Sequence, residues 1–254
     1  MIRLWAVASI VAFGLGTPTQ GHSQLSDTIE KVKPSILAVG TFQKTRNPPF
    51  VFRGTGFVVA DGTLVATNAH VVPEKIATES GEALIVIASS GGQLQRREAA
   101  ASVVDADHDL AVLKITGPAL PALELIDTPA VREGQTFGFT GFPIGNILGL
   151  TPVTHRAMIS AVTPIVLPMT SAKQLDSKAI NRLKTGPFSV YQLDGTAYPG
   201  NSGSPLYDLE TGRVVGVINM VFVRGSREAA LNQPSGISFA IPIRHLRELL
   251  ARKP

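Results

Sequence analysis

The pattern of apolar and polar positions divides the first half of the chain into short β-type segments. Apolar or alternating runs are separated by glycine, Asp-Gly and Gly-Gly steps, which is typical of strands joined by turns. Asp61-Gly62 stands between two of these runs and predicts a tight hairpin. The predicted strands of this first set cover residues 36–39, 56–60, 63–67, 83–87 and 111–115.

A second β set follows a proline-containing connector, residues 117–129. Inside this set, the polar segment 169–187 is predicted to be a long surface loop or a short helix. Because helices do not alternate with the strands, we expect an all-β chain built from two packed antiparallel units. The predicted strands of the second set cover residues 136–141, 157–162, 188–193, 203–207, 214–223 and 236–240.

Short helices are predicted before and after the β region. In the first, Asp27 is expected to cap the helix, with Glu30 completing a capping box and Pro34 ending it. The last helix is predicted over residues 242–252, with Pro242 in its first position. Its apolar residues recur at helical spacing on one face: Ile243, Leu246, Leu249 and Leu250.

The first 23 residues have the three-part layout of a secretory signal. A short positive start, Met1-Ile2-Arg3, precedes an apolar stretch at residues 4–16 and a polar, turn-prone stretch at 17–23. The apolar part is too short for a permanent membrane helix, although an uncleaved anchor is the alternative. We therefore expect a periplasmic or secreted protein whose folded part is residues 24–254, with no stable membrane span after cleavage.

Composition narrows the functional classes. Hydrophobic residues make up 44% of the chain and charged residues 17%, so a sizeable core is expected. The net charge of +4 comes from scattered basic residues, which indicates solubility and no nucleic-acid partner. The absence of cysteine excludes disulfides and a cysteine nucleophile. No spacing of histidines and acidic residues indicates a metal, and no cofactor is expected.

The run Gly200-Asn201-Ser202-Gly203-Ser204-Pro205-Leu206 is typical of a nucleophile loop. Its glycines allow a tight turn and close approach to a substrate. A serine hydroxyl needs a base and a group that orients the base. His70, in Thr67-Asn68-Ala69-His70-Val71-Val72, and Asp109, in Asp109-Leu110-Ala111-Val112-Leu113, are the candidates.

Seven ordered motifs make the chain resemble the trypsin-like serine peptidases, and among them the HtrA/Deg branch, over about residues 25–250. His-Asp-Ser is the chain order of the chymotrypsin triad. The motifs are Gly54-Thr55-Gly56-Phe57-Val58, the two segments around His70 and Asp109, Gly141-Phe142-Pro143-Ile144-Gly145, the Ser202 loop with Pro199 before it, Gly212-Arg213-Val214-Val215-Gly216-Val217, and Gly236-Ile237-Ser238-Phe239-Ala240-Ile241-Pro242.

The resemblance implies two packed six-stranded β-barrels with the active site between them. The N-terminal barrel would cover about residues 35–120 and the C-terminal barrel about 130–241. The third residue of the Ser202 loop would be the nucleophile, and the N–H groups of Gly200 and Ser202 would form the oxyanion hole. Ser204, where the family usually has glycine, is the competing serine; whether the hole is preformed stays open.

Three aspartates compete to orient the histidine. Asp105 and Asp107 are expected to be solvated loop charges, and Asp109 is favoured because it directly precedes an apolar strand. By resemblance, Asn219 would lie beside that carboxylate and near the substrate backbone; a structural strand asparagine is the alternative. The implied specificity pocket favours small or medium aliphatic side chains over Arg or Lys at the cleaved position, because its residues are uncharged. These residues are Thr196, Ala197, Met220 and Val221, with Asn219.

The expected function is that of a serine endopeptidase acting on exported or misfolded proteins through an acyl-enzyme. The alternative is a catalytically silent trypsin-fold binding protein. An α/β-hydrolase esterase using Ser202, Asp208 and His245 is disfavoured, because the predicted element after Ser202 is a strand and not a helix. Because few residues follow the predicted last helix, the PDZ domains usual in HtrA proteins are expected to be absent, and the family's trimeric assembly stays an open expectation.

Overall fold

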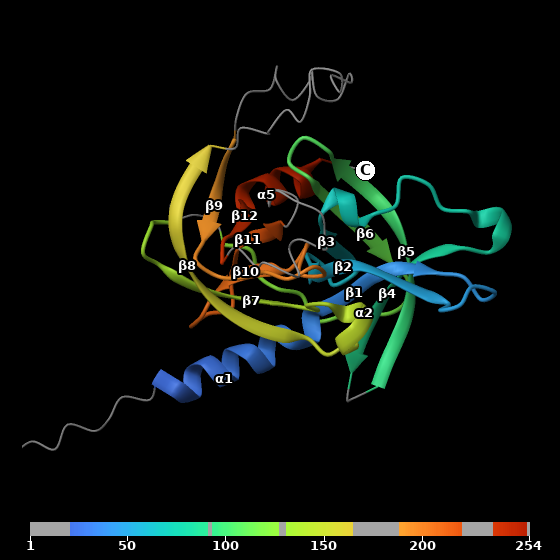
Figure 1. Cartoon of the computed structure of the whole chain (residues 1–254), viewed down its shortest axis with the longest axis horizontal. Coiled ribbons are helices and arrows are strands. Elements are labelled where there is room, and N and C mark those ends of the chain that lie inside the picture. The colour runs from blue at the N-terminus through green and yellow to red at the C-terminus, as the bar shows by residue number, and fades with distance from the viewer. Residues whose placement is uncertain (1–20, 91–92, 127–130, 165–187, 220–235, 253–254) are drawn as a thin grey trace, which may run out of the picture.

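The computed structural model describes residues 21–90, 93–126, 131–164, 188–219 and 236–252, and these form two closed antiparallel β-barrels side by side (Figure 1). The strand order is β1-β2-β3-β6-β5-β4 in the N-terminal barrel and β10-β11-β12-β9-β8-β7 in the C-terminal barrel. The expected all-β fold with two six-stranded barrels is confirmed.

The N-terminal barrel takes shape from runs of apolar residues that fill its interior. The Asp61-Gly62 hairpin forms as expected, with Val59 paired to Leu64 and Phe57 paired to Ala66 across the turn. The strands of this barrel are β1 (Ile36–Phe42), β2 (Phe50–Val59), β3 (Leu64–Thr67), β4 (Ala83–Ser90), β5 (Gln93–Asp105) and β6 (Leu110–Ile115).

Strand β5 was absent from the predicted set, and that part of the prediction is wrong. Most of its side chains are exposed and three consecutive ones, Arg96, Arg97 and Glu98, are charged, so its sequence lacks the apolar alternation of a half-buried strand. It forms because β4 and β6 both offer it a ladder of backbone hydrogen bonds.

The C-terminal barrel follows the predicted order of strands, although the strands differ in length from those expected. Its interior is a separate apolar cluster that includes Phe139, Ile159 and Leu193. The strands are β7 (Thr136–Gly141), β8 (Val153–Pro164), β9 (Ser189–Leu193), β10 (Pro205–Asp208), β11 (Val214–Asn219) and β12 (Ser238–Pro242), with the one-turn helix α2 (Gly145–Leu148) between β7 and β8.

Helices flank the barrels as expected, but the first begins earlier than predicted. Helix α1 spans Gly21–Val32, so Asp27 and Glu30 lie within it and the predicted capping box is wrong. Residues 22–26 contain neither glycine nor proline, so nothing in them stops the helix from extending toward Gly21. The predicted secretory signal lies mainly in residues 1–20, outside the described residues, and stays a prediction.

Helix α5 (Ile243–Ala251) lies where the predicted C-terminal helix was expected, with Pro242 just before it. Its buried apolar residues, including Leu246 and Leu249, join a cluster that contains Phe57 from the first barrel and Tyr207 from the second. The helix therefore packs on a core shared by both barrels, which ties the two halves of the fold together.

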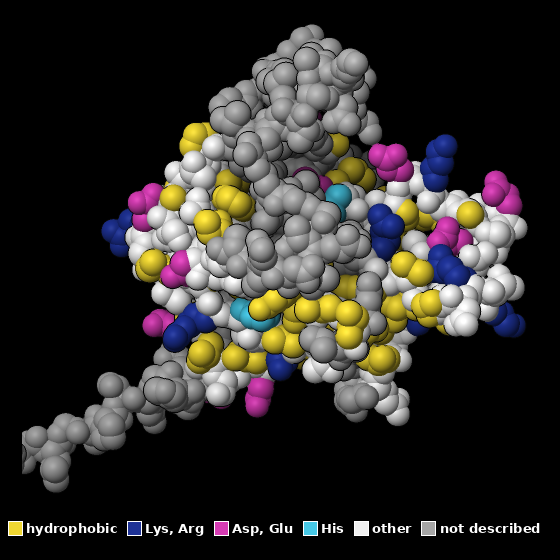
Figure 2. All heavy atoms as spheres, viewed as in Figure 1, with side chains coloured by type: hydrophobic (Ala, Val, Ile, Leu, Met, Phe, Trp, Pro, Cys, Tyr) yellow, Lys and Arg dark blue, Asp and Glu magenta, His cyan; other side chains and the backbone are white. Residues whose placement is uncertain are grey.

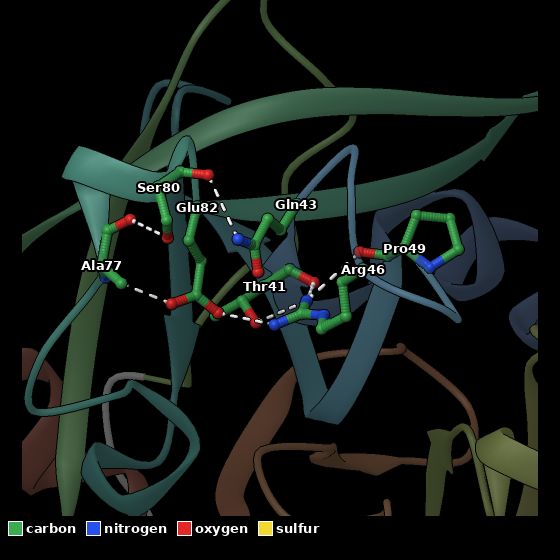
Figure 3. Close-up of polar contacts among 7 residues, drawn as sticks. All are labelled: Thr41, Gln43, Arg46, Pro49, Ala77, Ser80 and Glu82. Atoms are coloured by element: carbon green, nitrogen blue, oxygen red, sulfur yellow. Dashed lines mark hydrogen bonds and ion pairs between the residues drawn. The ribbon is translucent and has the colours of Figure 1, made fainter.

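At one end of the N-terminal barrel, Arg46 holds the β1–β2 connection against the segment before β4 (Figure 3). Its guanidinium donates to Glu82 at 2.8 Å and to the Thr41 carbonyl at 2.8 Å. Hydrogen bonds from Thr41, the Ala77 N–H and Arg46 lower the pKa of Glu82 to about 2. This network anchors the segment that continues from the His70 region into β4.

The described surface mixes charges of both signs. Figure 2 shows Lys and Arg side chains interspersed with Asp and Glu around the rim of the visible face, with apolar side chains gathered below the centre. Within the described ranges, no helix is both long and apolar enough to cross a bilayer.

Candidate active site

His70 and Asp109 lie against each other at the ends of two neighbouring segments of the N-terminal barrel. His70 is in the short 3-10 turn Ala69–Val71 that follows β3, and Asp109 directly precedes β6. His70 Nδ1 lies 2.6 Å from Asp109 Oδ2, and the His70 backbone N–H donates to Asp109 Oδ1 at 2.9 Å. An ionised carboxylate only accepts hydrogen bonds, so Nδ1 carries the proton and Nε2 presents a lone pair.

The backbone at Asp109 is in the left-handed region, with φ of 52°, a conformation that aspartate tolerates better than most residues. Its carbonyl accepts hydrogen bonds from the Ala69 N–H at 3.1 Å and from the Asn68 side chain at 3.0 Å. The turn before His70 and the residue at position 109 are therefore held together by backbone as well as by side-chain contacts.

Of the three candidate aspartates, only Asp109 contacts His70, as the sequence favoured. Asp107 is exposed, as expected. Asp105 is 6% exposed, so the prediction of a solvated charge is wrong for it. Its carboxylate accepts from the N–H groups of Asp107 and His108 and pairs with Arg252 at 3.2 Å, which stabilises the turn that leads to Asp109.

Asn219, at the end of β11, reaches from the C-terminal barrel to the same carboxylate. Its Nδ2 donates to Asp109 Oδ2 at 2.7 Å, and its side chain is buried. Asn219 therefore lies beside the aspartate, where the resemblance places it, and its expected contact with a substrate backbone stays a prediction. Asp109 thus accepts hydrogen bonds from both barrels.

The loop that contains Ser202 is held by its carbonyl groups. The Pro199 carbonyl accepts from the Ile144 N–H at 2.7 Å, the Gly200 carbonyl from the Thr55 hydroxyl at 2.7 Å, and the Ser202 carbonyl from the Thr55 N–H at 2.8 Å. Gly200 has φ of 104°, a conformation that favours glycine. The N-terminal barrel thus contributes two of the three anchors.

The N–H groups of the same loop divide into paired and unpaired ones. The paired ones donate to backbone carbonyls of the same connection or of β11: Asn201 to Tyr198, Gly203 to Ile218 and Ser204 to Asn201. Among the described residues, the N–H groups of Gly200 and Ser202 have no acceptor. These are the two amides that the sequence assigned to an oxyanion hole, and both are free to donate to a ligand.

Strand β2 connects the histidine side of the site with the serine side. Arg53 donates to the Val71 carbonyl at 2.7 Å and to the His70 carbonyl at 3.3 Å. A Cβ at Gly54 would lie 2.7 Å from a Val71 methyl group and 3.0 Å from the Ser202 carbonyl oxygen. The glycine therefore allows both segments to approach the same point of β2.

Within the described part of the chain, no hydrogen bond joins Ser202 Oγ to the His70 ring. Ser202 is 5% exposed. Hydrogen bonds of catalytic groups are often long without a ligand and shorten when substrate binds.

Ser204, the competing serine, is fully buried, and its hydroxyl has no hydrogen-bond partner among the described residues. A Cβ at Gly141 would lie 2.0 Å from Ser204 Oγ. The serine that replaces the family's glycine is therefore accommodated by a glycine on the facing strand, β7.

The residues assigned to the specificity pocket are only partly described, since Met220 and Val221 lie outside the described residues. Ala197 is 5% exposed, and its N–H donates to Ser238 Oγ at 2.7 Å. Ser238 also donates to the Gly195 carbonyl, so it fixes the segment around Thr196 to β12. Sequence reasoning gave Ser238 no role, although its motif was noted.

Two histidines that the sequence placed in unrelated contexts are stacked. The rings of His108 and His245 lie 4.0 Å apart at an angle of 20°, behind the turn that leads to Asp109. Burial is the main cause that lowers the pKa of His245 to about 4. Among the described residues, no group of three or more His, Cys, Asp or Glu side chains could hold a metal ion.

A family model described as "Trypsin-like peptidase domain" matches residues 54–217. Human serine protease HTRA4 is 32% identical over 241 residues, which are 93% of this chain and 43% of that protein. The "probable periplasmic serine endoprotease DegP-like" of Halomonas elongata is 33% identical over 196 residues, 75% of this chain and 32% of that protein. The chain thus spans less than half the length of these relatives.

A likeness in structure agrees with the family match. The crystal structure of the Rv3671c protease of M. tuberculosis in its active form has a TM-score of 0.65 to this chain, with 21% identity and coverage of 97% and 94% of the two chains. At this identity, the likeness supports the fold alone. From the matched domain, the HtrA relatives and the two barrels, we conclude that this chain belongs to the trypsin-like peptidase family and has HtrA proteases as its homologues.

Proposed function

We propose that the chain is a serine endopeptidase in which Ser202 is the nucleophile, His70 the general base and Asp109 the residue that orients the base. The observation that carries the proposal is the double link from His70, through Nδ1 and its backbone N–H, to the two oxygens of Asp109. That link sets the tautomer that leaves Nε2 able to accept a proton.

The chemistry follows from these positions. Ser202 Oγ attacks the carbonyl carbon of a peptide bond while its proton moves to His70 Nε2. The carbonyl oxygen becomes an oxyanion that accepts from the unpaired N–H groups of Gly200 and Ser202. His70 then gives its proton to the leaving amine as the acyl-enzyme forms. In the second half, water attacks the acyl carbon while His70 accepts its proton, and His70 returns the proton to Ser202 Oγ as the acid is released.

The same proposal covers substrate class and location. Exported or misfolded polypeptides are the proposed substrates, and the periplasm or the extracellular space is the proposed location. The predicted secretory signal supports this, and so does the relative whose name describes it as a probable periplasmic endoprotease. A homotrimer remains part of the proposal on the family resemblance alone.

Labelling with a fluorophosphonate probe tests the assignment of the triad. The purified chain is expected to be labelled and to cleave casein, and Ser202→Ala is expected to lose both activities. Ser204→Gly is the matched control, because it changes the neighbouring serine to the residue that the family usually has there, and it should remain labelled. His70→Ala should also lose labelling while the protein stays folded, because the base is absent.

The catalytically silent alternative makes the opposite prediction. A folded chain that is neither labelled nor active on casein, with a normal circular dichroism spectrum, would support a binding protein and contradict the proposed function. Labelling that persists in Ser202→Ala would show that another residue is the nucleophile.

A further inference from the structure

Thr55 occupies an unusual position among the residues around the site, because one buried side chain serves two separate segments. It lies on β2 and is fully buried. Its hydroxyl donates to the Gly200 carbonyl at 2.7 Å and accepts from the Phe142 N–H at 3.1 Å. These two bonds use the single hydroxyl proton and one lone pair.

The Thr55 backbone strengthens the same connection. Its N–H donates to the Ser202 carbonyl at 2.8 Å, and its carbonyl accepts from the Thr67 hydroxyl at 2.7 Å. Thr55 therefore contacts the Ser202 loop from both its backbone and its side chain, while Thr67 holds it from behind. A residue anchored in this way has little freedom to follow a movement of the loop.

The direction of the oxyanion amides depends on these carbonyl anchors. In a trans peptide the N–H points opposite to the carbonyl of the same unit. The Pro199 carbonyl is held by the Ile144 N–H, so the Gly200 N–H points away from that contact. The Gly200 carbonyl belongs to the next peptide unit, between Gly200 and Asn201, which lies between the two units that carry the oxyanion amides. Thr55 holds this carbonyl, so the intervening unit cannot rotate without breaking a buried hydrogen bond.

The segment at residues 142–144 contributes the other half of the arrangement. Ile144 is in the left-handed region with φ of 49°, which is strained for a β-branched residue, and it still donates to Pro199. The Phe142 N–H is fixed by the Thr55 hydroxyl. Thr55 thus bonds both to the oxyanion loop and to the strained turn that supports it.

We propose that the Thr55 hydroxyl is a positioning residue that keeps the oxyanion hole open by joining the Gly200 carbonyl to the turn at residues 142–144. This inference rests on the proposed function, because an oxyanion hole has a role only in a working protease. Thr55 is fully buried and bonds to the carbonyls of Gly200 and Ser202, so it acts through the direction of the Gly200 and Ser202 amides.

The test compares Thr55→Val, which keeps the shape and removes the hydroxyl, with Thr55→Ser, which keeps the hydroxyl. Loss of a single oxyanion donor typically lowers kcat about a hundredfold to a thousandfold. A loop that is loosened but still present should lose only part of that contribution to kcat. We therefore expect Thr55→Val to lower kcat roughly tenfold to a hundredfold, with KM changed less than about twofold. Thr55→Ser should stay near the unaltered enzyme.

A spectroscopic measurement separates positioning from general weakening of the fold. A peptidyl trifluoromethyl ketone forms a hemiketal in which Ser202 Oγ bonds to the carbonyl carbon, the C=O π bond opens to an oxyanion, and the hydroxyl proton moves to His70. The pKa of that oxyanion, followed by ¹⁹F NMR, should rise in Thr55→Val because the amides support the charge less well. Thr55→Ser should leave it unchanged.

Thr28→Val is the matched control. It removes a buried hydroxyl that donates to the Glu210 carbonyl at 3.1 Å, outside the site, and should leave kcat and the oxyanion pKa unchanged. If Thr55→Val does not fold, Thr55→Ala should show the same changes in the same direction. A folded Thr55→Val with unaltered kcat and oxyanion pKa would overturn the inference. An unaltered chain that forms no hemiketal would contradict the proposed function instead.

Discussion

The buried histidine of the C-terminal helix should make the stability of this protein fall between pH 8 and pH 5. His245 is 7% exposed, stacks on His108 and meets the edge of Phe188 at 5.3 Å. Neither ring nitrogen has a hydrogen-bond partner among the described residues. Burial, with smaller contributions from His108 and Arg244, lowers the pKa of His245 to about 4.

The sign of the effect follows from the two states. The unfolded chain binds a proton at the ordinary histidine pKa of 6.5, while the folded chain resists it until about pH 4. The stability contributed by neutral His245 is therefore complete above pH 6.5 and is lost as pH falls toward 4. Between pH 8 and pH 5, this one group should lower the free energy of unfolding by about 2 kcal/mol.

The charged groups around His245 do not obscure this window. Glu248 Oε2 lies 3.7 Å from His245 Nδ1, and Arg252 pairs with Asp105 behind the stack. The pKa of Asp105 is lowered by hydrogen bonds from His108, although burial opposes them, so its stabilising charge is lost only below its ordinary value of 3.8. Between pH 5 and pH 8 this carboxylate stays ionised in both states.

The assay is urea unfolding at pH 8 and pH 5, in a Ser202→Ala background that prevents self-cleavage. His245→Phe keeps a planar ring in the stack and removes the titration, so its loss of stability between the two pH values should be about 2 kcal/mol smaller than that of the parent. His155, whose pKa is also lowered by burial, is present in both proteins and cancels in the comparison. Equal losses in the parent and in His245→Phe, or in His245→Leu as a second variant, would refute the reasoning.

Two further predictions concern the serine loop and the specificity pocket. Gly141→Ala places a methyl group 2.0 Å from Ser204 Oγ and should lower the free energy of unfolding by roughly 1–3 kcal/mol. Adding Ser204→Gly should relieve part of this cost. If chemical denaturation shows that the effects of the two substitutions simply add in the double variant, the contact is contradicted. In a peptide library, the chain should cleave after small or medium aliphatic residues, because Thr196, Ala197 and Asn219 of the proposed pocket offer no charge to balance Arg or Lys. Preferential cleavage after Arg or Lys would be the contrary result.

Most of the strands and the composition of the site were accessible from sequence, because each depends on a local signal. Period-two alternation and the Asp61-Gly62 turn predict strands and a hairpin from neighbouring residues alone. The glycines around Ser202 likewise indicate a tight loop without knowledge of its surroundings. The strand β5 was missed for the same reason, since its formation depends on two neighbouring strands and not on its own side chains.

Which residues of the site are hydrogen-bonded to one another depends on the tertiary structure. Three aspartates lie within five positions. The sequence favours Asp109 by its place before an apolar strand, but only the fold shows it paired with His70 and shows Asp105 buried against His108 and Arg252. Likewise, the hydroxyl of Thr55 meets Gly200 because the two barrels pack together, and no local pattern encodes that contact. The amino-acid sequence by itself determined which chemical groups are available and in which elements they lie. Only the tertiary structure decided which groups are within hydrogen-bond distance, inside one barrel for His70 and Asp109 and between the barrels for Thr55 and Gly200, because those contacts join residues far apart along the chain.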